Sequence, residues 1–242
     1  MGRHGTIANR KSAQDSKRSA MFTKYSRQII VAAKAGGDPD FNPSLRVAID
    51  KAKSIGMPND NINRAIKKGT GELGGEQYEE LQFEGYGPSG VAIIVEALTD
   101  NKNRTASFVR SVFDKNGGNL GTPGCVSYMF SRKGVVIIDS EDLDEDEVMM
   151  VALDAGADDF IAEDEDYVVY TTPDGFHEVR EKLEAEGIPM LDADVKMVPQ
   201  NYVDVTDPEA VKKIRRILAL LEESDDVQNV YTNWNEPDDD EE

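Results

Sequence analysis

The chain has 242 residues, more than one small core needs, and a net charge of −20 that is unevenly distributed. Its single cysteine, Cys125, excludes an internal disulfide framework and a cysteine-based zinc site. No apolar run reaches the roughly 20 residues of a membrane-spanning helix, and the N-terminus lacks the apolar core of a signal peptide. We therefore expect a cytoplasmic protein without membrane contact.

Residues 10–34 are predicted to form the first helix, and they are the most basic stretch of the chain. Met21, Tyr25, Ile29 and Ala32 recur at the spacing of a buried helical stripe. The cations on the flank of that stripe could be no more than a solvated face, but together they can also lie along phosphates. The residues expected to do so are Arg10, Lys11, Lys17, Arg18, Lys24, Arg27 and Lys34.

Two further helices are predicted at residues 44–55 and 59–68. Asn42 followed by Pro43 is typical of a helix start, and Gly56 and Gly69 are typical helix ends. Arg64, Lys67 and Lys68 on the third helix extend the positive charge and would form a second anchor. We expect residues 1–71 to be a three-helix bundle that acts as a basic nucleic-acid-binding domain.

The remaining chain is predicted to contain two interleaved ferredoxin-like α/β domains, giving an α+β protein. Residues 134–198 have the complete β-α-β-β-α-β order of one such unit. A second β-α-β-β-α-β order would join residues 91–130, with strands at 91–99 and 125–130 and a helix at 105–116, to a strand, a helix capped by Asp207 and a strand within 202–232. A further strand is predicted at 78–84. The expected domains are 78–130 with 200–235, an inserted acidic domain at 131–199, and a disordered acidic tail at 236–242.

The distribution of charge favours a polyanion partner. Residues 1–71 hold 14 Lys and Arg against 5 Asp and Glu. Residues 72–242, which we call the acidic body, have a net charge of −29. A basic region on an acidic body is typical of a protein that binds nucleic acid, and the acidic body would orient the binding by repulsion.

No catalytic constellation is evident, and we expect neither an enzyme nor a cofactor. His4 and His177 lack a partner pattern, and the acidic runs lack the spacing of a calcium loop, so solvated charge is the simpler interpretation. Two glycine-rich loops, residues 85–90 and 117–124, are either tight turns or places where the backbone approaches a partner. The residues expected to make such contacts are Tyr86, Gly87, Asn119 and Gly121.

Several long blocks of the sequence resemble the corresponding blocks of the YebC family. They include RKSAQDSKR, MFTKYSRQI, GGDPDFNPSLRVAIDKAK, MPNDNINRAIKKGTGE, EGYGPSGVAIIVEALTDNKNRT and GGNLGTPGCVSYMF, and they span almost the whole chain. The family usually reads GHSKWANIKHRK at its N-terminus, whereas here His4 to Asn9 runs directly into Arg10. Contacts made through that tip are therefore not transferred to this chain.

The resemblance implies an N-terminal helical domain followed by two interleaved α/β domains. It also implies one or both of two functions, since family members are described as DNA-binding transcriptional regulators or as translation factors that help stalled ribosomes. Our first hypothesis is a non-enzymatic, ribosome- and RNA-binding translation factor that contacts ribosomal RNA or tRNA. In it, the acidic body would face basic ribosomal proteins. The alternatives are a DNA-binding transcriptional regulator and an adaptor whose acidic body binds basic proteins.

Overall fold

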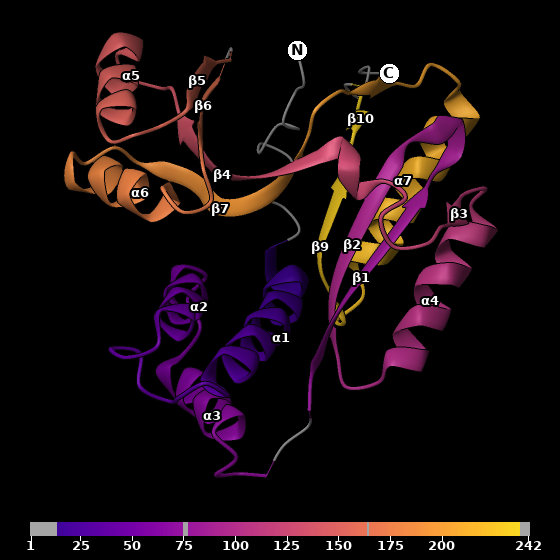
Figure 1. Ribbon diagram of the computed structural model, residues 1–242, viewed down its shortest axis with the longest axis horizontal. Coiled ribbons are helices and arrows are strands. Elements are labelled where there is room, and N and C mark those ends of the chain that lie inside the picture. The colour runs from indigo at the N-terminus through magenta and orange to yellow at the C-terminus, as the bar shows by residue number, and fades with distance from the viewer. Residues whose placement is uncertain (1–13, 75–76, 164, 238–242) are drawn as a thin grey trace. The chain divides into compact units, whose positions relative to one another are not determined.

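The computed structural model describes residues 14–74, 77–163 and 165–237, and it confirms an α+β protein with N-terminal helices followed by α/β parts (Figure 1). Contacts between residues divide the chain into two compact units. Unit 1 comprises residues 1–127 and 202–242, and unit 2 comprises residues 128–201. The N-terminal helices and the first sheet therefore belong to the same unit.

The N-terminal part of unit 1 contains three packed helices, α1 (Gln14–Ala33), α2 (Pro43–Ser54) and α3 (Asn59–Gly69). Asn42 caps α2, because its side chain accepts a hydrogen bond from Leu45 N at 3.1 Å. The core is formed by Ile29, Ile30 and Ala33 of α1 with the apolar faces of α2 and α3. The predicted stripe was wrong at Met21, which is 44% exposed, because the buried face of α1 is centred on Ile29 and Ala33.

Gly69 allows α3 to approach α1 closely. A Cβ atom at this position would lie 2.4 Å from the carbonyl oxygen of Ile30 and 2.6 Å from Cβ of Ala33. Both neighbours belong to the core-facing side of α1 and cannot rotate away. The glycine at the end of α3 therefore sets the distance between two helices as well as ending one of them.

Replacement of Gly69 by alanine should destabilise the protein by about 1–3 kcal/mol, the usual cost of overpacking a core. Urea denaturation followed by far-UV circular dichroism measures the change. Lys67→Ala, at an exposed position of the same helix, is the control and should change the free energy of unfolding by about 0.5 kcal/mol or less. Equal stability of the Gly69→Ala variant and the wild type would contradict the close approach.

The second part of unit 1 is a four-stranded antiparallel sheet covered by two helices. Its strand order is β3-β1-β2-β9, formed by β1 (Glu79–Tyr86), β2 (Ala92–Thr99), β3 (Asn119–Leu120) and β9 (Val227–Thr232). The helices α4 (Lys102–Lys115) and α7 (Pro208–Glu222) both pack on β2 through a shared apolar core. Asp207 caps α7 as predicted, with its carboxylate accepting from Glu209 N.

Two predicted strands of this sheet were wrong. Residues 125–130 form a turn, η3 (Ser127–Met129), followed by the start of the next strand. The N–H groups of Val126 and Ser127 donate to the side chain of Glu84, so they are not available for hydrogen bonds to a neighbouring strand. The chain after residue 202 forms β8 (Val203–Asp204), which pairs in parallel with β10 (Trp234–Asn235) instead of joining the main sheet. The positions left in the sheet are taken by β1 and β3.

Unit 2 has the ferredoxin-like order predicted from the sequence. It runs through β4 (Phe130–Asp139), α5 (Glu145–Asp154), β5 (Asp159–Ala162), β6 (Asp166–Thr171), α6 (Phe176–Ala185) and β7 (Met190–Pro199). The sheet order is β5-β6-β4-β7, and both helices contribute to one apolar core. Helix α6 begins only at Phe176, because the Thr172 hydroxyl accepts a hydrogen bond from Gly175 N within the turn that precedes it.

In the part of the chain that the structure describes, none of the helices is both long enough and apolar enough to cross a membrane.

Candidate nucleic-acid interface

The cations of α1 whose side chains are described point into unit 1. Nζ of Lys24 donates to the carbonyl oxygen of Glu222 at 3.1 Å, and Nζ of Lys34 donates to that of Tyr78 at 2.9 Å. Burial lowers the pKa of Lys24, although the negative charges of Glu222 and Asp225 partly oppose this effect. Helix α1 is therefore held on two sides, by the core of the three helices and by polar contacts with the sheet part of the unit.

Arg27 was predicted to contact phosphate, and its position in the structure corrects that prediction. Its side chain is only 12% exposed, and its Nη1 donates to Asp226 Oδ1 at 2.6 Å. The same nitrogen also donates to the carbonyl oxygens of Asp225 at 2.7 Å and Leu98 at 2.9 Å. A guanidinium with these partners is not free to bind an external phosphate, so Arg27 is a structural residue of unit 1.

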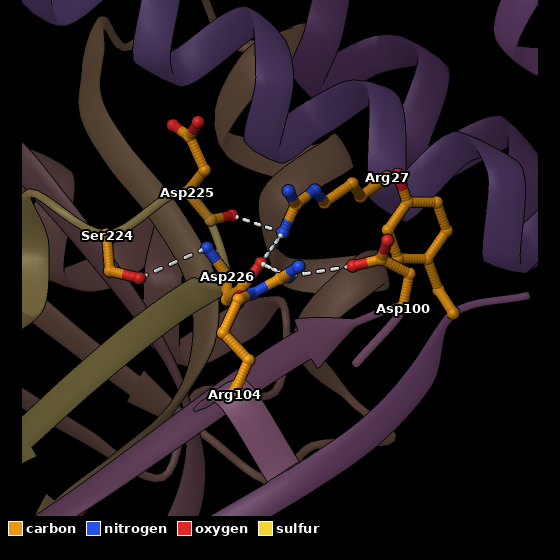
Figure 2. Close-up of a pocket in the computed structure, with 7 residues that line it drawn as sticks. Arg27, Asp100, Arg104, Ser224, Asp225 and Asp226 are labelled. Carbon is orange, nitrogen blue, oxygen red and sulfur yellow. Dashed lines mark hydrogen bonds and ion pairs between the residues drawn. The ribbon is translucent and has the colours of Figure 1, made fainter. Parts of the chain in front are cut away.

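Asp226 is the centre of this polar cluster (Figure 2). Arg27 and Arg104 approach its carboxylate from different elements, and Thr105 Oγ1 donates to it at 2.7 Å. Burial of the carboxyl raises its pKa, but the hydrogen bonds from Thr105, Arg27 and Arg104 outweigh this effect and lower it. Two arginines and three aspartates line the pocket at this place, and the ion pairs among them join α1, α4 and the residue before β9.

The cations of α3 have a different environment. Arg64 and Lys67 are exposed and Lys68 is half-buried, and none of the three makes an ion pair with the described residues. Asn61 and Asn63 are also exposed on this helix, whose opposite face is buried through Ile62 and Ala65. The outward face of α3 is therefore a polar and cationic surface open to a partner, which we call the α3 surface.

The other predicted phosphate contacts are not described at the level of side chains. Arg10 and Lys11 lie outside the described residues. Lys17 and Arg18 lie on the described backbone of α1, but their side chains are outside the description.

The two glycine-rich loops lie side by side, since Tyr86 pairs with Asn119 across β1 and β3. Asn119 and Gly121 are exposed, whereas Tyr86 is half-buried and its hydroxyl donates to the Cys125 carbonyl oxygen at 3.0 Å. Gly87 is buried against Ile93 and Ile214, so it cannot contact a partner as predicted. The exposed positions in its loop are Ser89 and Gly90.

A buried carboxylate holds the second of these loops. Glu84 is 4% exposed, and it accepts hydrogen bonds from the N–H groups of Gly124, Val126 and Ser127 at 2.8–3.0 Å. Burial raises its pKa, but these three bonds and one from Gln82 outweigh it and lower the pKa to about 2. Glu84 therefore remains ionised and fixes the path of the chain after Gly121.

Matches to two family models show to which protein family the chain belongs. Residues 3–72 match the TACO1/YebC protein N-terminal domain, and residues 78–234 match the TACO1/YebC second and third domain. The chain belongs to the TACO1/YebC family.

Similar proteins match almost the whole length of this TACO1/YebC chain. A probable transcriptional regulatory protein of Clostridioides difficile is 55% identical over 97% of this chain and 99% of its own. A probable transcriptional regulatory protein of Geobacillus thermodenitrificans is 52% identical over 95% of this chain and 94% of its own. The crystal structure of a conserved hypothetical protein from Aquifex aeolicus is similar with a TM-score of 0.87 and 46% identity, covering 97% of both chains.

Sequence reasoning missed the residues that organise this TACO1/YebC chain internally. Glu84, Arg104 and Asp226 are separated by up to 142 positions and belong to no local motif, so in the sequence they look like ordinary surface charge. Among the described residues, no group of His, Cys, Asp or Glu side chains is arranged to hold a metal ion. Burial and the nearby Glu84 charge raise the pKa of Cys125, which disfavours its reactive thiolate form.

Proposed function

We propose that this protein is a nucleic-acid-binding regulator of gene expression, acting as a ribosome- and RNA-binding translation factor that relieves stalling. Residues 1–71 are the proposed binding domain. The α3 surface is the observation that carries the proposal, because Arg64, Lys67 and Lys68 are cations without an internal partner among the described residues. Membership of the TACO1/YebC family supports a regulatory role.

Electrostatics favour an oriented contact with RNA. Cations on a helix bind phosphate without reading base sequence, which suits a factor that acts on many messages. The rest of the chain carries a net charge of −29 and is repelled by the same polyanion. This repulsion would leave the acidic body facing away from RNA, where it can meet basic ribosomal proteins.

A DNA-binding transcriptional regulator is the second candidate, and one feature of α3 favours it. Asn61 and Asn63 are exposed beside Arg64 on the same helix. Asparagine can form paired hydrogen bonds with adenine, and arginine with guanine, in the major groove of DNA. The curated relatives in Clostridioides difficile and Geobacillus thermodenitrificans are also named as probable transcriptional regulatory proteins.

Neutralising the α3 surface should weaken RNA binding. With about six phosphates neutralised, the affinity of the wild type should fall on the order of a thousandfold between 50 and 200 mM salt. The variant Arg64→Gln/Lys67→Gln/Lys68→Gln should lose roughly half of that salt dependence and bind tens of times more weakly at 100 mM salt. Fluorescence anisotropy with a labelled ribosomal RNA hairpin measures both quantities. An unchanged salt slope would contradict the proposed contact.

The design of this variant follows from the structure. Charge reversal of Lys24 and Arg27 would disturb the contacts that hold α1 in unit 1, so loss of binding could result from loss of structure. Substitutions on α3 avoid this problem. Arg180→Gln/Lys182→Gln/Lys196→Gln, which makes the same change of net charge in unit 2, is the matched control.

Cosedimentation with bacterial ribosomes separates the two candidates. A translation factor should sediment with ribosomes, and the α3 variant should remain in the supernatant. A transcriptional regulator should instead retain a promoter fragment in the presence of excess competitor DNA. If neither occurs and the α3 variant still supports growth as well as the wild type, the adaptor hypothesis is the one that survives.

A further inference from the structure

The sheet part of unit 1, residues 77–127 and 202–237, has its own segregation of charge. All eight of its Lys and Arg residues lie on two helices: Lys102, Arg104, Arg110 and Lys115 on α4, and Lys212, Lys213, Arg215 and Arg216 on α7. The acids on these helices are Asp114, Glu209 and Glu222, while the strands and loops carry acids without any cation. The helical layer is therefore cationic within a protein whose other α/β regions are acidic.

Helix α7 contributes the densest part of this layer. Lys212, Arg215 and Arg216 lie on the half of α7 opposite Ala210, Ile214 and Ile217, which pack on the sheet, and Lys213 lies on the flank between the two faces. Arg215 is bonded to Glu236 and to the carbonyl oxygen of Pro237, at 3.0 Å each. Lys212, Lys213 and Arg216 are exposed, and the described residues supply no ion-pair partner for them.

Lys213 lies close to both glycine-rich loops, and Lys212 and Arg216 are its neighbours on α7. The side chain of Lys213 reaches Gly117, with Cδ 3.7 Å from the position of a Cβ there, and Pro88 approaches the same point at 3.8 Å. Helix α7 also contacts the turn η2 (Pro88–Gly90) directly. Lys115 ends α4 two residues before Gly117 and is exposed. One cation from each of two helices, Lys213 of α7 and Lys115 of α4, thus lies near the place where the two loops meet.

The loops at this place offer backbone without side chains. Gly90 has φ +77° and Gly124 has φ +89°, and the Cβ position of each faces open space. A chain with such glycines lets a sugar-phosphate backbone approach within hydrogen-bonding distance, which a surface of bulky side chains would prevent. The four exposed cations, Lys115, Lys212, Lys213 and Arg216, provide positive charge, and the glycines leave space for a phosphate backbone.

We propose that Lys115, Lys212, Lys213 and Arg216, with the exposed positions of loops 85–90 and 117–124, form a second phosphate-binding surface for RNA. This surface, which we call the α7 surface, deepens the proposed function and rests on nucleic acid being the partner. Its residues lie on other elements of the chain than the α3 surface. A nucleic acid is favoured over an acidic protein because the open glycines accommodate a phosphate backbone but offer no apolar anchor.

Binding of the full-length chain to a fluorescein-labelled tRNA transcript tests the proposal. The variant Lys212→Gln/Lys213→Gln/Arg216→Gln should reduce affinity about tenfold at 100 mM salt and lower the salt slope by about 2. The unit 2 variant Arg180→Gln/Lys182→Gln/Lys196→Gln, with the same net charge, should bind as the wild type does. An unchanged thermal unfolding midpoint, expected for exposed positions, shows that the α7 variant is folded.

The outcomes distinguish this inference from the proposed function. If the α3 variant loses affinity and the α7 variant does not, the α7 surface is not a contact and the proposed function stands. If both α7 and unit 2 variants lose affinity equally, net charge alone explains the effect and the inference fails. If the wild type does not bind RNA at all, both proposals fail. Loss in the α7 variant with retention in the unit 2 variant supports the inference, whatever the α3 variant does.

Discussion

Replacement of Asp226 by alanine should lower the free energy of unfolding by about 3–5 kcal/mol, the usual cost of removing one partner from a buried ion pair. The carboxylate is 10% exposed, and it accepts hydrogen bonds from Arg27, Arg104 and Thr105. Alanine would leave the guanidinium of Arg27, itself 12% exposed, with two carbonyl oxygens but no counter-charge. Since Arg27 belongs to α1, the loss should loosen the attachment of that helix to the sheet.

Urea denaturation measured by circular dichroism gives the change in stability, and amide hydrogen exchange in α1 locates it. Asp225→Ala is the matched control, because it removes an exposed carboxylate at the neighbouring position and should cost about 0.5 kcal/mol or less. Combining Arg27→Met with Asp226→Leu should restore much of the stability, since an apolar pair often replaces a buried ion pair at little cost. A loss below about 1 kcal/mol for Asp226→Ala would show that the cluster does not hold α1.

The parts of the fold that the sequence predicted well are those determined by local chemistry. The start of α2 follows from an asparagine that accepts a backbone hydrogen bond ahead of a proline, and the start of α7 follows from Asp207 and Pro208. The strand and helix order of unit 2 follows from alternating apolar runs and turn residues. These signals act over a few residues, so they can be found without knowing what packs against them.

The positions of the α1 cations could not be predicted in this way. The sequence places Lys24 and Arg27 on the flank of the predicted apolar stripe, and a single helix offers no reason why that flank should be covered. The cover comes from Glu222, Asp225 and Asp226, about 200 residues further along the chain. The prediction that the cations of α1 contact nucleic acid was therefore wrong at Arg27. The cations of α3, in contrast, have no ion-pair partner among the described residues.

The false strand at residues 125–130 has a similar origin. Val126 and Phe130 are buried, so the apolar pattern correctly indicated inward-facing side chains. The pattern could not show that the N–H groups of Val126 and Ser127 are bound to the carboxylate of Glu84, about 40 residues earlier. A carboxylate that satisfies consecutive amides replaces the hydrogen bonds of a strand and leaves a turn.

Replacement of Glu84 by glutamine should destabilise the protein by about 3 kcal/mol at neutral pH, and the loss should depend on pH. The pKa of Glu84 is lowered from 4.5 to about 2, and each unit of difference between folded and unfolded states corresponds to about 1.4 kcal/mol. Because the folded-state pKa is the lower one, this stabilisation is fully present above pH 4.5. It is lost as the pH falls toward 2, where the carboxyl becomes protonated and resembles the amide of glutamine.

Urea denaturation of both proteins at pH 7, 5, 4 and 3 tests this behaviour, because the other carboxyl groups titrate in both and cancel in the difference. The difference should be largest at pH 7 and 5 and should shrink steadily at pH 4 and 3. Amide exchange at Gly124, Val126 and Ser127 should accelerate in the variant, since their shared acceptor has lost its charge. Glu80→Gln, at an exposed position of the same strand, controls for the change of net charge. A difference that stays constant from pH 7 to pH 3 would mean that the variant acts through altered packing, and that the ionised carboxylate is not what holds the loop.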